Sequence, residues 1–123
     1  MYFYENELCA IVKMAKSMAA ADGRLDPKEL ILIAAELAKF TPSSIKGSSI
    51  IDSTDRMEFD EAIRILRNLT TDEKKYVGGY LAAIMAVDGH IDAKEAVEWQ
   101  LVSTLAQFPT MSAKEALDFW KSH

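Results

Sequence analysis

Apolar residues recur every three or four positions along most of the chain, which is the spacing of amphipathic helices. The pattern predicts helices at about residues 4–21, 27–39, 54–68, 71–87 and 93–107, and a short final helix capped by Ser112. Only five glycines and three prolines interrupt it. The sequence therefore predicts an all-α fold, a single helical bundle of about six helices, with the segment 40–53 irregular apart from a possible single turn.

The expected helices differ in how much of their surface is apolar. Those at 27–39 and 71–87 are apolar nearly all round, so we expect them to be the most buried. Helix 93–107 is expected to turn Val97, Leu101, Val102 and Leu105 inward, with Trp99 at the flank. Glycines inside a helix cost about 1 kcal/mol each relative to alanine. Gly78 and Gly79 are therefore expected to let another helix approach closely.

Helix starts carry recognisable capping residues. Three pairs have the spacing of a capping box, in which the side chain of each residue accepts a hydrogen bond from the backbone N–H of the other. They are Asp55 with Glu58, Thr70 with Glu73, and Ser112 with Glu115. Each pair predicts the start of a helix close to its first member.

The chain contains an internal repeat. Residues 20–29 read Ala-Ala-Asp-Gly-Arg-Leu-Asp-Pro-Lys-Glu, and residues 86–95 read Ala-Val-Asp-Gly-His-Ile-Asp-Ala-Lys-Glu. Six of the ten positions are identical, and each copy joins two expected helices. We infer a duplicated helix–loop–helix with pseudo-symmetric halves, the repeat units covering about residues 5–39 and 71–107.

Part of this repeat is explained by folding alone. Asp26 and Asp92 are natural N-caps, and Glu29 and Glu95 complete a capping box three residues later. The first acid of each loop is different: Asp22 and Asp88 follow a helix C-terminus, where the helix dipole disfavours an anion by roughly 0.3–1 kcal/mol. Their repetition at an unfavourable place suggests a function, although an Asx-type turn would also explain them.

The acidic loops suggest a divalent cation. Asp-Gly-x-Leu/Ile-Asp-x-x-Glu matches the second half of an EF-hand calcium loop. The first and third ligand positions would be Met18 and Ala20, or Ile84 and Ala86, which offer no side-chain oxygen, so a calmodulin-like site is not expected. A looser site for Ca²⁺ or a similar cation would use acids within each loop, or acids pooled from both loops. The candidate metal ligands are Asp22, Asp26, Glu29, Asp88, Asp92 and Glu95.

Composition excludes several classes of protein. Acidic residues outnumber basic ones 19 to 14, which argues against nucleic-acid binding. The longest nearly uncharged apolar run, Tyr76 to Val87, is about twelve residues, short of the roughly twenty of a membrane span, so no transmembrane segment is expected. The single cysteine, Cys9, rules out an internal disulfide and favours a reducing compartment, so a cytoplasmic protein is expected.

The paired Ala-x-Asp-Gly-x-Leu/Ile-Asp-x-Lys-Glu motifs resemble the bacterial TerB-like family, named for tellurite resistance, over about residues 5–108. That domain also resembles the amino-terminal region of membrane-anchored DnaJ-type co-chaperones. The resemblance implies an all-helical bundle with an internal duplication, a cytoplasmic role in stress or tellurite resistance, and a bound metal ion. Its acidic ligands would be Asp22, Glu29, Asp88 and Glu95, then Asp26 and Asp92.

We therefore expect residues 1–123 to form a single TerB-like domain without enzymatic activity. It would present its duplicated acidic loops to a divalent metal ion, or to a protein partner that the sequence does not identify. The alternative is a protein–protein interaction scaffold in which the repeat acids only cap helices. An enzyme is the weakest interpretation, because no nucleophile–base constellation is visible.

Overall fold

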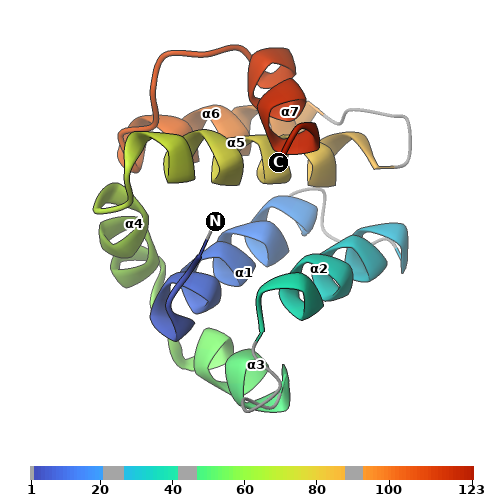
Figure 1. The fold of residues 1–123 in the computed structure, drawn as a ribbon, viewed down its shortest axis with the longest axis vertical. Helices are drawn as coiled ribbons and strands as arrows, with labels where there is room; N and C mark the ends of the chain where they lie inside the picture. Colours follow the sequence, from blue (N-terminus) through green and yellow to red (C-terminus); the bar gives the residue numbers. More distant parts are fainter. Residues whose placement is uncertain (1, 21–26, 42–46, 88–92) are drawn as a thin grey trace.

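The computed structural model describes residues 2–20, 27–41, 47–87 and 93–123. Within these ranges it contains helices and no strand (Figure 1). The helices are α1 (Glu5–Ala19), α2 (Pro27–Phe40), α3 (Gly47–Arg56), α4 (Phe59–Arg67), α5 (Thr71–Ala86), α6 (Ala93–Leu105) and α7 (Ala113–Lys121). The all-α prediction is confirmed, with seven helices in the described ranges rather than about six.

Helices α1 and α5 form the centre of the bundle. Helix α1 contacts α2, α3, α4, α5 and α6, and α5 contacts α1, α2, α6 and α7. In Figure 1, α5 lies across the molecule with α7 above it and α1 below it. Of the two helices that we expected to be most buried, 71–87 is confirmed as α5. The other central helix is α1, not the helix at 27–39.

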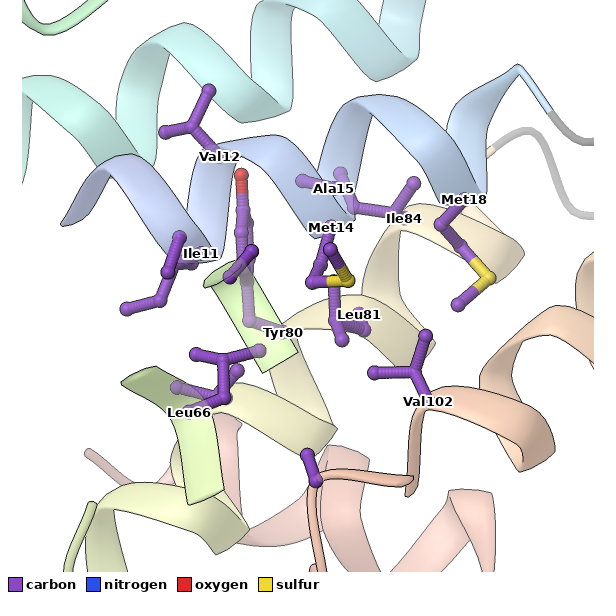
Figure 2. Close-up of a cluster of buried hydrophobic side chains, with 14 of the residues drawn as sticks. Ile11, Val12, Met14, Ala15, Met18, Leu66, Tyr80, Leu81, Ile84 and Val102 are labelled. Carbon is purple, nitrogen blue, oxygen red and sulfur yellow. The ribbon is translucent and has the colours of Figure 1, made fainter. Parts of the chain in front are cut away.

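The interior is built from equivalent positions of the repeat. Met14 and Met18 of α1 and Tyr80 and Ile84 of α5 are at most 1% exposed, and Figure 2 shows them gathered in one cluster. Met18 and Ile84 are 66 positions apart, the same separation as the two acidic loops. The first helices of the two repeat units therefore pack against each other.

Helix α2 buries only one of its faces. The buried residues are Glu29, Ile33, Glu36 and Leu37, spaced as one stripe of a helix. Leu30 and Ile31 are 45% and 68% exposed. The expectation that this helix is buried on most sides is wrong, because α2 lies at the periphery and contacts only α1 and α5 closely.

The inward face of α6 also differs from the prediction. Val97, Leu101 and Leu105 are exposed, whereas Trp99 and Val102 are buried. The indole Nε1 of Trp99 donates a hydrogen bond to the carbonyl oxygen of Gly78 on α5, 2.9 Å away. This buried hydrogen bond orients α6 so that Trp99, and not the aliphatic stripe, faces the core.

The predicted helix 54–68 is two helices. Helix α3 begins at Gly47, inside the segment expected to be irregular, and ends at Arg56, and α4 begins at Phe59 after an extended Glu58. The expected Asp55–Glu58 capping box is wrong, because Asp55 lies inside α3 and Glu58 makes no side-chain cap. The break lets α3 and α4 pack separately against α1.

In the glycine pair of α5, Gly79 faces α7, and Gly78 faces Phe108 and Met111 in the segment between α6 and α7. A β-carbon on Gly79 would overlap the carbonyl oxygen of Ala116 and lie 2.6 Å from Cβ of Trp120. A β-carbon on Gly78 would meet only side chains, the nearest being the flexible methyl end of Met111 at 2.5 Å. The expectation that these glycines let another helix approach is confirmed for Gly79, whereas Gly78 meets side chains of the segment between α6 and α7.

Replacing Gly79 by alanine tests this close approach. We expect Gly79→Ala to lower the free energy of unfolding by about 2 kcal/mol, because α7 must move away. The matched control, Gly78→Ala, should stay within about 1 kcal/mol of the wild type, since Met111 can shift and alanine favours the helix. Urea unfolding followed by circular dichroism measures both. Equal stability of the two variants would contradict the assignment.

Two of the expected capping boxes are present. The backbone N–H of Glu73 donates to Oγ1 of Thr70 at 3.2 Å, and the backbone N–H of Thr70 donates to Oε1 of Glu73 at 2.9 Å. Ser112 and Glu115 exchange the same two bonds before α7. These caps satisfy backbone donors that a helix start otherwise leaves unpaired.

The Thr70–Glu73 cap should contribute measurably to the free energy of unfolding. Thr70→Ala removes the hydroxyl acceptor and should lower the free energy of unfolding by about 1 kcal/mol. Thr71→Ala, one position later at the first residue of α5, keeps the capping box and serves as the control. Thermal unfolding of the two variants checks this, and a loss of equal size in both would count against the cap.

Candidate acidic-loop site

Two of the six predicted metal ligands lie on described helices. Glu29 is in the first turn of α2 and Glu95 in the first turn of α6, and each is only 5% exposed. They occupy the same position of the two repeat units. Carboxylates are seldom this buried unless they are hydrogen-bonded, paired with a cation or bound to a metal.

The four aspartates predicted as ligands cannot be placed. Asp22, Asp26, Asp88 and Asp92 lie outside the described residues. Within the part of the chain that is described, no group of three or more His, Cys, Asp or Glu side chains could hold a metal ion. The expected N-cap of α2 by Asp26 also lies outside the described residues.

The helices on either side of these loops share one end of the bundle. In Figure 1, α1 and α5 both end on the right-hand side, and α2 and α6 both begin there. Met18 and Ile84, each four residues before the first aspartate of its loop, lie close together in Figure 2. The hydroxyl of Ser17 also donates to Oε1 of Glu98 at 2.9 Å, joining α1 of one unit to α6 of the other.

A polar cluster that no sequence motif predicts joins α2 to α5. The hydroxyl of Tyr76 donates to Oε1 of Glu36, and Nζ of Lys39 donates to the Tyr76 hydroxyl at 3.0 Å. Burial, together with the Glu36 carboxylate, raises the pKa of Tyr76. The only sequence signal is one acid in the otherwise apolar body of helix 27–39. The cluster holds α2 in a fixed rotation about its axis.

The single cysteine lies in the core. Cys9 is buried, and its thiol donates to the carbonyl oxygen of Ile50, with Sγ and O 3.7 Å apart. Burial raises the pKa of this thiol. A nucleophilic cysteine needs the opposite shift, toward the thiolate. The position therefore suits packing.

Comparison with solved structures identifies a neighbour of unknown function. No family model matches the chain. No curated protein matches it either. A crystal structure of a protein of unknown function from Porphyromonas gingivalis matches it with a TM-score of 0.83 and 39% sequence identity. The match covers 98% of this chain and 92% of that chain.

The match extends over nearly the whole length of both chains, so the helical arrangement above is common to the two proteins. No helix in the described ranges is both long and apolar enough to span a bilayer. At this identity and coverage, the chain belongs to the same family as the Porphyromonas gingivalis protein of unknown function.

Proposed function

We propose that this chain is a non-enzymatic, TerB-like module that binds a divalent cation through its two acidic loops. The observation that supports this most is the burial of Glu29 and Glu95 at equivalent positions, directly after the two loops. A carboxylate held out of water is stabilised by a cation next to it. The same burial would also follow from capping, so a binding experiment has to separate the two.

The chemistry of the loops fits a hard cation. Ca²⁺ takes six to eight oxygen ligands, and each loop region offers three carboxylates in sequence. Since α1 and α5 end on the same side of the bundle, the loops start from neighbouring points, which favours pooling of their acids. The cytoplasmic location and the role in stress or tellurite resistance implied by the family resemblance form part of the same proposal.

Calcium should stabilise the folded protein if the loops bind it. At ten times the dissociation constant, binding adds about 1.4 kcal/mol to the free energy of unfolding. For a domain of this size that raises the melting temperature by about 5 °C. The double variant Asp22→Asn with Asp88→Asn should lose this shift while keeping its helical circular dichroism.

A matched variant separates specific binding from a change in net charge. Asp52→Asn with Asp118→Asn removes the same two charges from exposed positions of α3 and α7, and should keep the full shift. The proposal fails if millimolar Ca²⁺, Mg²⁺ or Mn²⁺ leaves the melting temperature of the wild type unchanged. It also fails if both double variants lose the shift equally.

A second candidate function is binding of a protein partner. The observation that favours it is the exposed apolar surface of α2, where Leu30 and Ile31 face solvent. Large contiguous apolar patches on a protein surface often mark interaction sites. In this case the repeat acids serve only as helix caps, as in the scaffold interpretation of the sequence.

Asp26→Ala distinguishes the two functions. If Asp26 only caps α2, the substitution should lower the free energy of unfolding by about 1 kcal/mol. The loss should then be the same in EDTA and in millimolar Ca²⁺. A loss that is clearly larger in Ca²⁺, measured by urea unfolding in both buffers, would show that this residue contributes to cation binding and would contradict the scaffold interpretation.

A further inference from the structure

The exposed side of α2 is apolar and basic. We define the α2 face as Leu30, Ile31, Ala34, Ala35 and Ala38, all of which are exposed. Lys28 and Lys39 are exposed near its two ends. The two acids of the helix, Glu29 and Glu36, are both buried on the opposite side. A chain with a net charge of −5 thus presents one helix face without an exposed carboxylate.

A hollow lies at one edge of this face, between α2 and α1, and Leu30 and Ala34 are the residues of the face that line it. It has a volume of about 200 Å³. Its walls come from α1, α2 and α3, and its lining residues are Val12, Lys16, Leu30, Ile33, Ala34, Leu37 and Thr54. A cavity of about 150 Å³ accommodates a benzene-sized group. The hollow is therefore large enough for one leucine or phenylalanine side chain from another molecule.

The edge of the hollow carries positive charge. A second hollow of about 330 Å³ shares Lys16 and Thr54 with the first and is also lined by Lys13. Nζ of Lys16 lies 2.9 Å from Oδ1 of Asp55, the one carboxylate among the described residues that line the two hollows. Lys13 makes no ion pair with the described residues. An acidic partner would therefore meet Lys13 at this edge, since Nζ of Lys16 pairs with Asp55 and Nζ of Lys39 bonds to the hydroxyl of Tyr76.

We propose that the α2 face binds one amphipathic helix of a partner protein, with a large apolar side chain in the hollow and acidic residues along its flanks. This inference rests on the second candidate function, binding of a protein partner. Alanines at three positions of the face allow a helix backbone to come close, as Gly79 does for α7. Helix-in-groove recognition uses such apolar anchors at helical spacing.

Charge and shape disfavour two other occupants. A second copy of this chain would bring the lysines beside one α2 face against those of the other, because the acids of α2 are buried. A bilayer surface is bound by helices with several large apolar residues. The α2 face has two large residues, Leu30 and Ile31, and otherwise alanines.

Fluorescence anisotropy with a designed probe tests the proposal on the full chain. The probe is a labelled helical peptide with leucines at i, i+3, i+4 and i+7 and glutamates at its flanks. The control peptide has lysines in place of the glutamates. We expect the acidic peptide to bind at least tenfold more tightly than the basic one, and its affinity to fall as salt is added.

Variants then locate the binding site. Ala34→Glu places bulk and negative charge on the α2 face and should weaken the acidic peptide about tenfold or more. Lys13→Glu should weaken it and flatten the salt dependence. The matched control, Gln100→Glu, makes the same charge change as Ala34→Glu at an exposed position of α6 and should leave the affinity within about twofold. Circular dichroism checks that each variant is folded.

Other outcomes would overturn the proposal. The proposal fails if the acidic peptide does not bind, or if it binds the wild type and Ala34→Glu equally well. It also fails if the free chain self-associates and Ala34→Glu abolishes this self-association. The same holds if vesicles of mixed neutral and anionic lipid capture the wild type but not Ala34→Glu. Changes in the NMR chemical shifts of backbone amides show where the peptide binds, and so distinguish failure of this inference from failure of the partner-binding function on which it rests. If the peptide perturbs α6 around Val97 and Leu101 and leaves α2 unchanged, the chain still binds a partner, but not through the α2 face.

Discussion

The packing of α1 against α5 is the contact on which the rest of the structure depends. Met14 and Met18 meet Tyr80 and Ile84 in a fully buried layer (Figure 2). Full burial of such side chains contributes about 1.5–3 kcal/mol each. Every other helix contacts one or both of these two, with α3 and α4 on α1, α7 on α5, and α2 and α6 on both.

The same contact arranges the candidate acidic-loop site. Because α1 and α5 end on one side of the bundle, the helices that follow the two loops begin there as well. Glu29 and Glu95 lie in the first turns of these two helices, at equivalent positions of the repeat, and both are buried. Duplication thus places the helices that flank the two loops at one end of the bundle. A protein that binds one shared cation would need this arrangement, and so would one that only caps two equivalent helices.

Two opposite sides of helix α2 belong to the two proposed binding sites. Its buried side holds Glu29 beside the acidic loop and Glu36 in the hydrogen-bonded cluster with Tyr76 on α5. Its exposed side holds Leu30 and Ile31. The Glu36–Tyr76 hydrogen bond fixes the rotation of the helix, because a buried carboxylate that lost its donor would be strongly destabilised. Cation binding at one side and partner binding at the other would therefore act on the same rigid element.

Local features of the sequence were sufficient to predict the helices other than α3 and α4, the repeat, the Thr70–Glu73 cap and the close helix approach at Gly79, because each depends on neighbouring residues or backbone sterics. The tertiary structure decided which sides of α2 and α6 face the core. Helix 27–39 is apolar nearly all round and has no periodic signal for its inward side, which Glu36 occupies with a hydrogen bond from Tyr76 of α5. In α6 the aliphatic stripe indicated one side, but the hydrogen bond from Trp99 to Gly78 of α5 lies on another. It also decided the break after Arg56, because α3 and α4 each had to lie against α1, a constraint that acts between segments far apart in the chain.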